Sequence, residues 1–139
     1  MCVIGYKARK RLNRPRIIDY ANSEYRSDFL DIWLMANCYF CISTGTGLDE
    51  VTRIFRKPAV YVNYLPLQQL VTYDYVITTP KHLVWKKTNT RLTLSEYLEN
   101  SYGHSNEYAS IIIQDLSAKE IKDAVMEQEA RLTGSWRSS

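Results

Sequence analysis

The amino-acid sequence predicts an α/β protein built around a mostly parallel sheet. Short apolar runs, typical of buried strands, alternate with stretches in which apolar residues recur at helical spacing. The alternation is densest between residues 17 and 64, where three predicted strands and two predicted helices follow one another through short connections. Such a β-α-β-α-β series favours parallel strands, because each helix returns the chain to the same edge of the sheet. We therefore expect a Rossmann-like domain of three layers.

Composition supports one globular domain. The 139 residues are 45% hydrophobic and 24% charged, a balance that excludes general disorder and fits a single hydrophobic core. The formal net charge is +3, which is compatible with a phosphate-bearing ligand but predicts no nucleic-acid partner. The strongest charge asymmetry is the basic run at residues 7–16, KARKRLNRPR, which we interpret as a solvated loop rather than a phosphate contact.

The first predicted elements are two short strands at residues 3–6 and 17–20, on either side of the basic run. A helix follows, because apolar residues recur at helical spacing and Ser27, followed by Asp28, supplies a plausible cap. The apolar residues of this helix are Phe29, Ile32, Trp33 and Ala36.

The middle of the chain continues the alternation. Residues 39–43 form a continuous apolar run, as expected for a strand buried on both faces. Residues 48–55 are predicted to be a helix with Val51, Ile54 and Phe55 on one face, ending at the sequence RKP. Residues 59–64, AVYVNY, form the next predicted strand.

The C-terminal half is less regular. We expect a strand at residues 76–79, a short helix beginning near Thr93, and a strand or linker at residues 111–113. The final helix is the clearest, because Ser117 and Glu120 form a capping-box pattern ahead of an amphipathic stretch.

Between the strand at residues 39–43 and the next helix lies the sequence STGTG, residues 43–47, which we call the STGTG turn. In open parallel sheets, ligands bind beyond the carboxyl ends of strands, where loops lead into helices. Glycines permit close backbone approach there, and unpaired amides at a helix start attract phosphate or carboxylate groups. The turn is neither a P-loop nor a GxGxxG fingerprint, so a simple flexible connection is an equally good interpretation.

Two acidic residues follow the turn. Asp49 and Glu50 either complement the helix dipole or accept hydrogen bonds from ribose or sugar hydroxyls. The two histidines, His82 and His104, lie in no recognised nucleophile or metalloprotease pattern, and we interpret both as surface or loop residues. The sequence thus indicates no catalytic residue and no metal site.

The three cysteines, an odd number without a CxxC pair, are interpreted as buried thiols of a reducing compartment. No apolar run approaches the roughly 20 residues that cross a bilayer, and no secretory signal is visible. The expected location is cytoplasmic. A peripheral position at the inner face of the membrane is the alternative location.

Residues 17–67, IIDYANSEYRSDFLDIWLMANCYFCISTGTGLDEVTRIFRKPAVYVNYLPL, resemble the C-terminal half of a family of bacterial glycosyltransferases with the GT-B architecture. The later strings LTLSEYLEN and DLSAKEIKDAVMEQEARLTGSW are also similar to that family, so the resemblance covers nearly all of the chain. The motifs that carry it are Asp19-Tyr20, Arg26-Ser27-Asp28-Phe29 with Asp31, Cys38-Tyr39-Phe40, Gly45 to Gly47, Phe55 to Pro58, and Asn63.

This resemblance implies two Rossmann-like domains that face a cleft, the C-terminal one binding the nucleotide-sugar donor. The STGTG turn would hold the donor's diphosphate, Asp49 or Glu50 would contact ribose or sugar, and Arg26 would offer positive charge to the leaving diphosphate. Amide dipoles and cationic side chains would then stabilise the leaving group without a cofactor. The donor-binding residues implied are Arg26, Ser43, Thr44, Gly45, Thr46, Gly47, Asp49 and Glu50.

Two departures from the family pattern shape this expectation. An N-terminal domain for the acceptor is missing, and Ile4 precedes Gly5 where the family has an arginine. Residues 1–139 are therefore expected to be a single donor-binding domain, inactive alone, of an enzyme that builds surface polysaccharide. A glycan or lipid-linked acceptor would bind through the missing domain, and the apolar faces that domain normally covers would favour self-association. The alternatives are a non-catalytic or degenerate module of the same fold, or half of a nucleotide-sugar epimerase.

Overall fold

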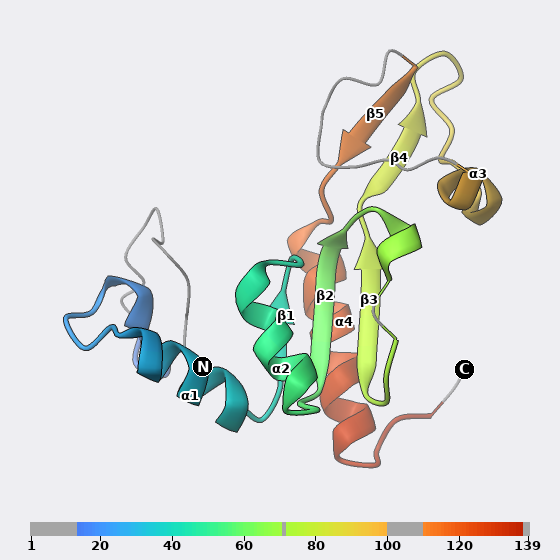
Figure 1. The fold of residues 1–139 in the computed structure, drawn as a ribbon. Helices are drawn as coiled ribbons and strands as arrows, with labels where there is room; N and C mark the ends of the chain where they lie inside the picture. The colour runs from blue at the N-terminus through green and yellow to red at the C-terminus, as the bar shows by residue number, and fades with distance from the viewer. Residues whose placement is uncertain (1–13, 71, 100–109, 138–139) are drawn as a thin grey trace. The chain divides into compact units, whose positions relative to one another are not determined.

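The computed structural model describes residues 14–70, 72–99 and 110–137, and Figure 1 shows their arrangement along the chain. The predicted strand at residues 3–6, most of the basic run and His104 lie outside the described residues. The chain divides into two compact units. Unit 1 comprises Met1–Tyr39 and Thr46–Lys57, and unit 2 comprises Phe40–Gly45 and Pro58–Ser139.

Of the strand predicted at residues 17–20, only Ile18 forms a β-bridge, and the chain enters a short 3-10 helix, Tyr20–Asn22, at its end. The predicted strand is not extended because local side-chain bonds favour a turn over strand pairing. The side-chain amide of Asn22 donates to both carboxylate oxygens of Asp19, each at 3.0 Å. The buried Tyr20 hydroxyl accepts from the Ser27 amide at 3.0 Å, which joins this turn to the start of the next helix.

Helix α1, Asp28–Asn37, confirms the predicted helix and its cap, since the Ser27 hydroxyl accepts the Leu30 amide at 3.2 Å. Its apolar residues are not on its buried side, however. Asp31 and Met35 are buried, whereas Phe29, Ile32 and Trp33 are 73%, 46% and 50% exposed.

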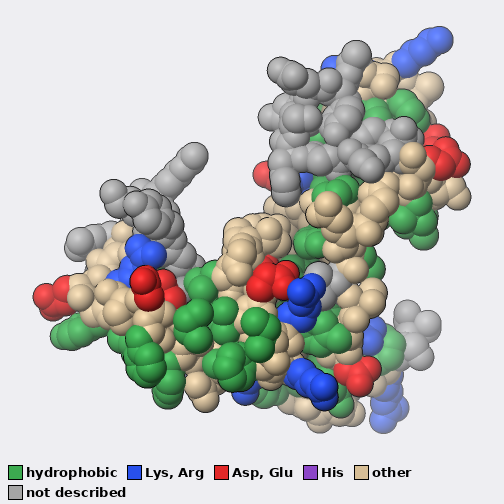
Figure 2. Space-filling model, in the orientation of Figure 1, with side chains coloured by type: hydrophobic (Ala, Val, Ile, Leu, Met, Phe, Trp, Pro, Cys, Tyr) green, Lys and Arg blue, Asp and Glu red, His purple; other side chains and the backbone are tan. Residues whose placement is uncertain are grey.

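The second helical segment of unit 1 is shorter than predicted. The 3-10 helix Gly47–Asp49 leads directly into α2, Glu50–Ile54, and the chain leaves α2 through Arg56 with a φ of 50°. Val51 and Thr52 are buried, while Ile54 and Phe55 are 73% and 53% exposed. Figure 2 shows hydrophobic side chains gathered on the surface over α1 and α2.

Unit 2 contains a parallel three-stranded sheet, which confirms the predicted α/β class. Its strands are β1, Cys41–Ser43, β2, Ala59–Tyr64, and β3, Val76–Pro80, in the order β1-β2-β3. Both neighbouring pairs are parallel (Figure 1). Among the described residues of the connection from β2 to β3, the only helical segment is the 3-10 helix Leu67–Gln69.

Strand β2 is buried on both of its faces, whereas the edge strand β1 leaves Ile42 42% exposed. Val60 and Val62 pack with Leu116 and Ala124, so helix α4, Ala118–Leu132, covers that face of the sheet. Ala59 and Tyr61 alternate with these valines and face the opposite way, as the two-residue period of a strand requires. Tyr64 joins their cluster after the register shift that follows Val62.

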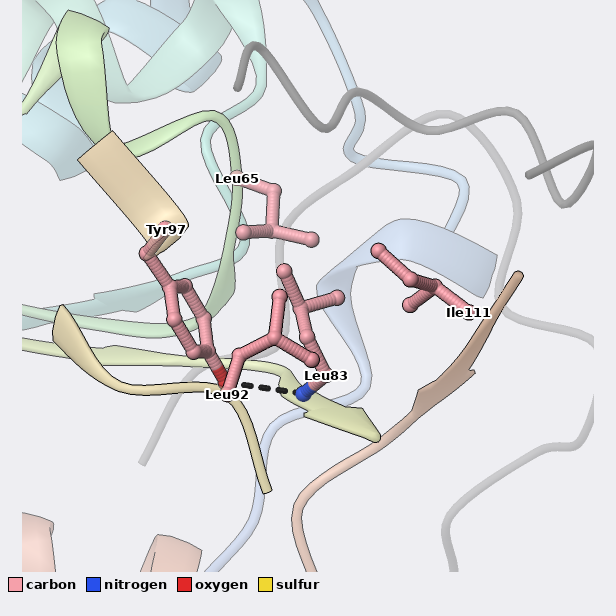
Figure 3. Close-up of a cluster of buried hydrophobic side chains, with 5 residues drawn as sticks. All are labelled: Leu65, Leu83, Leu92, Tyr97 and Ile111. Carbon is pink, nitrogen blue, oxygen red and sulfur yellow. Dashed lines mark hydrogen bonds between the residues drawn. The ribbon is translucent and has the colours of Figure 1, made fainter. Parts of the chain in front are cut away.

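A small antiparallel sheet forms the rest of unit 2. Strand β4, His82–Trp85, pairs with β5, Ile111–Gln114, and helix α3, Leu94–Glu99, packs beside them. Figure 3 shows their shared core, in which the Tyr97 hydroxyl accepts the Leu83 amide at 2.7 Å. The core side chains are Leu65, Leu83, Leu92, Tyr97 and Ile111. Strand β4 has no counterpart among the predicted elements, whereas α3 and β5 confirm a predicted helix and strand.

Candidate functional site

The first half of the STGTG turn leaves the carboxyl end of β1. Ser43 is the last residue of β1 and pairs with Tyr61 of β2. Gly45 has a φ of 84°, in the left-handed region that favours glycine, and its amide lies 3.3 Å from the Ser43 hydroxyl oxygen, which accepts its hydrogen bond. The turn therefore occupies the edge of the parallel sheet at which ligands of α/β proteins bind.

Gly45 is also held close to an aromatic ring. A Cβ atom at this position would lie 2.9 Å from Cε2 of Tyr64, a distance that real Cβ atoms do not tolerate. The Tyr64 ring is fixed in turn, because its hydroxyl donates to the Gln69 carbonyl at 2.7 Å and its ring packs edge-on against Tyr61. Glycine at position 45 is therefore required by the local fold, with or without a ligand.

The second half of the turn belongs to unit 1. Thr46 and Gly47 are exposed, and a Cβ atom on Gly47 would meet no atom within 4 Å. The Thr46 amide donates to Oδ2 of Asp49 at 3.0 Å, and Asp49 is only 3% exposed. Asp49 is thus placed to shape the turn, which is the helix-start role that the sequence left open beside sugar contact.

The remaining predicted residues take part in ion pairs within unit 1. Glu50 lies 2.7 Å from Arg53, with both side chains about half exposed. Arg26 lies 3.6 Å from Asp31, whose side chain is 12% exposed. Of the eight predicted residues, Ser43, Thr44 and Gly45 lie in unit 2 and the other five lie in unit 1.

A polar cluster that the sequence did not reveal lies where β3 passes into β4 and β5 passes into α4. Lys81 Nζ lies 2.8 Å from Asp115 Oδ1, and His82 Nε2 lies 2.7 Å from Glu120 Oε1. The Leu116 amide donates to the Asn63 side chain at 2.7 Å. Only the Ser117–Glu120 capping box could be predicted from the sequence, because the residues of the other contacts are far apart along the chain.

Glu120 is the most strongly held carboxylate of this cluster. Hydrogen bonds from the Ser117 hydroxyl at 2.7 Å and the Ser117 amide at 2.8 Å, together with His82, lower its pKa from 4.5 to about 2. Glu120 is therefore ionised at neutral pH and acts only as a hydrogen-bond acceptor.

Among the residues that the structure describes, no group of three or more His, Cys, Asp or Glu side chains is arranged to hold a metal ion. Cys38 and Cys41 are free thiols, and burial raises the pKa of Cys38. No helix within the described ranges is both long and apolar enough to cross a membrane.

A cavity of about 390 Å³ lies at the opposite, amino end of β3, lined by Asp74, Tyr75, Val76, Gln128 and Arg131. Gln128 is fully buried, and its amide nitrogen donates to the Tyr75 carbonyl at 2.9 Å. None of the predicted donor-binding residues lines this cavity.

Comparison of the chain with models of protein families, with curated proteins and with solved structures finds no match. The local geometry of the turn and the class of the fold are therefore the basis for a functional assignment.

Proposed function

We propose that the chain binds the diphosphate of a nucleotide sugar at the STGTG turn, as the donor-binding domain of a GT-B-type glycosyltransferase. The observation that carries this proposal is the position of the STGTG turn directly after parallel strand β1, at the edge of an α/β sheet where ligands bind. The exposed Thr46 and Gly47, followed by two short helical segments, add support.

In this proposal the turn contacts the ligand through backbone amides and hydroxyls. Ser43, Thr44 and Thr46 supply hydroxyl donors, and Gly47 leaves room for close approach of phosphate oxygens. Asp49 keeps the turn in shape, while Glu50 and Arg26 contact the ligand only if they exchange their present ion-pair partners. Charge on the leaving diphosphate would be stabilised by these fixed donors.

Transfer itself requires an acceptor, a glycan or a lipid-linked sugar, which a partner domain would bring. The proposed role of this chain is therefore donor binding in the synthesis of surface polysaccharide, without turnover by the chain alone.

A second candidate function is supported by one observation. The Thr46 amide, which a phosphate would need, is already satisfied by the buried carboxylate of Asp49. An anionic group at this place disfavours a second anion. This contact favours the alternative, a non-catalytic module of the same fold in which the turn's amide is hydrogen-bonded within the chain.

Calorimetric titration with nucleoside diphosphates separates the two candidates. Gly47→Val adds bulk where no neighbour is disturbed, so it should preserve folding but weaken binding by roughly 10-fold or more, the effect of losing a hydrogen bond to a charged group. Leu94→Ala is the control, because Leu94 is exposed on α3, outside the turn. It should leave binding unchanged. Absence of binding by the unaltered chain at millimolar ligand would favour the non-catalytic module.

A further inference from the structure

Helix α1 exposes its apolar side and buries a polar residue. Phe29, Ile32 and Trp33 are spaced by three and four positions, so they lie on one side of the helix, and all three are exposed. The buried positions of α1 are Asp31 and Met35. A surface helix of a globular domain normally turns such an apolar stripe toward the core. Among the described residues, unit 1 leaves this stripe uncovered.

Helix α2 adds to this surface within the same unit. It contacts α1, and both helices belong to unit 1. Ile54 at the end of α2 and Phe55 directly after it are exposed. Figure 2 shows the hydrophobic side chains gathered over the two helices. We call these side chains the α1–α2 patch, which consists of Phe29, Ile32, Trp33, Ile54 and Phe55.

The chemistry of the patch restricts what can cover it. All five side chains are hydrophobic, and three of them are aromatic, the composition typical of the core of a protein–protein interface. Other residues of the two helices are charged, namely Asp28 and Asp31 of α1 and the Glu50–Arg53 pair of α2. A partner must therefore be apolar over a similar area. The same patch on a second copy of the chain meets this requirement.

The size of the patch fits a contact between two copies. The exposed fractions of its side chains range from 46% to 73% and together equal about three whole side chains. At roughly 200 Å² for each large side chain, this amounts to about 600 Å² on one copy, the upper end for a monomer's largest apolar patch. Two such patches bury about 1,200 Å², the lower end of the range for specific interfaces. The area is therefore sufficient for a dimer of modest affinity.

We propose that the chain forms a two-fold symmetric dimer in which the α1–α2 patches of two copies pack together, with the two α1 helices antiparallel. A two-fold contact uses the same surface on both subunits. The antiparallel direction opposes the two helix dipoles and separates the acidic first turns by the length of a ten-residue helix, roughly 15 Å. Trp33, near the middle of α1, then lies close to the two-fold axis. This inference is independent of ligand binding at the STGTG turn.

Sedimentation velocity of the full chain tests the dimer. We expect the mass to rise from one chain toward two between roughly 1 and 200 μM, because interfaces at the small end of the range are weak. Trp33→Glu brings two carboxylates together near the axis and should weaken association by roughly 30-fold or more, the effect of losing an aromatic anchor. Leu94→Glu is the matched control, because it places the same charge on an exposed apolar residue of α3, outside the patch. It should leave association unchanged.

A mixing experiment separates loss of the interface from loss of folding. Trp33→Glu and Trp33→Lys should each be monomeric, with the circular dichroism of the unaltered chain. An equimolar mixture of the two should form dimers again, because opposite charges then meet near the axis. Phe29→Glu, a change at a more exposed position of the same stripe, should also be monomeric.

Three results would overturn the inference. A monomeric unaltered chain at the highest concentration would mean that the patch is covered within the chain or by a different protein. A dimer that survives both Trp33→Glu and Phe29→Glu would place the contact on another face. A mixture of the two Trp33 variants that stays monomeric would contradict the antiparallel arrangement. None of these results changes the expectation for nucleoside diphosphates at the STGTG turn.

Discussion

At the residue scale, the two glycines of the STGTG turn have different requirements. Gly45 combines a φ of 84° with a Cβ position only 2.9 Å from the Tyr64 ring. Gly47 has neither restriction. A requirement for glycine at position 45 therefore says nothing about a ligand, whereas intolerance of side chains at position 47 would indicate one.

Gly45→Ala should lower the free energy of unfolding by about 1–3 kcal/mol, because the new Cβ meets both the left-handed backbone and the Tyr64 ring. Urea denaturation measures this change. Gly47→Ala is the control and should cost nothing, since an ordinary backbone with open space accepts alanine. Equal destabilisation by the two substitutions would contradict the described turn.

The lowered pKa of Glu120 predicts that the stability of the folded chain depends on pH. Its pKa of about 2 in the folded chain lies below its usual value of 4.5, so its contacts stabilise the folded state fully above pH 4.5. That stabilisation should disappear progressively as the pH falls from 4.5 toward 2. Urea midpoints of the unaltered chain and of Glu120→Gln should converge over this window. A difference that stays constant from pH 7 to pH 3 would refute the assignment.

At the scale of helices and strands, local sequence signals predicted which elements are present better than they predicted which side of each element is buried. Strand β2 was predicted at its observed bounds, because the apolar run AVYVNY is bounded by Pro58 and a following Leu-Pro. Helix α4 follows from the Ser117–Glu120 capping box. The buried side of α1 was not predictable from periodicity, since Asp31, which pairs with Arg26, is buried while Phe29 is exposed.

In the candidate site, too, features made by adjacent residues were predictable from the sequence, whereas contacts between distant residues were not. The STGTG turn was found from sequence because glycines and hydroxyl residues are adjacent in the chain. The contact between His82 and Glu120 spans 38 positions, so only the fold brings the two residues together. Strand β4 was missed for a related reason, because its pairing with β5 crosses a long connection that includes α3.

The core of the small antiparallel sheet should carry much of that element's stability. Leu83 is fully buried beside Tyr97 and Ile111, so Leu83→Ala should lower the free energy of unfolding by about 2–5 kcal/mol. Leu94→Ala serves as the control, because Leu94 is 67% exposed, and should change stability by no more than about 0.5 kcal/mol. Thermal unfolding followed by circular dichroism distinguishes these outcomes. A small effect at Leu83 would mean that this core is not formed.

At the scale of the whole molecule, the parallel sheet of unit 2 establishes the α/β class, and the function is proposed from one edge of that sheet. The turn that carries the proposal crosses from unit 2 into unit 1 between Gly45 and Thr46. Donor binding at the turn should stabilise the folded chain by mass action on the folded state.

Amide NMR during titration with a nucleoside diphosphate tests the central claim most directly, because it reports on each backbone donor of the turn. The account predicts saturable shifts confined mainly to Thr44, Gly45, Thr46, Gly47 and Leu48. Unshifted turn amides at millimolar ligand, or shifts restricted to residues outside the turn, would contradict it.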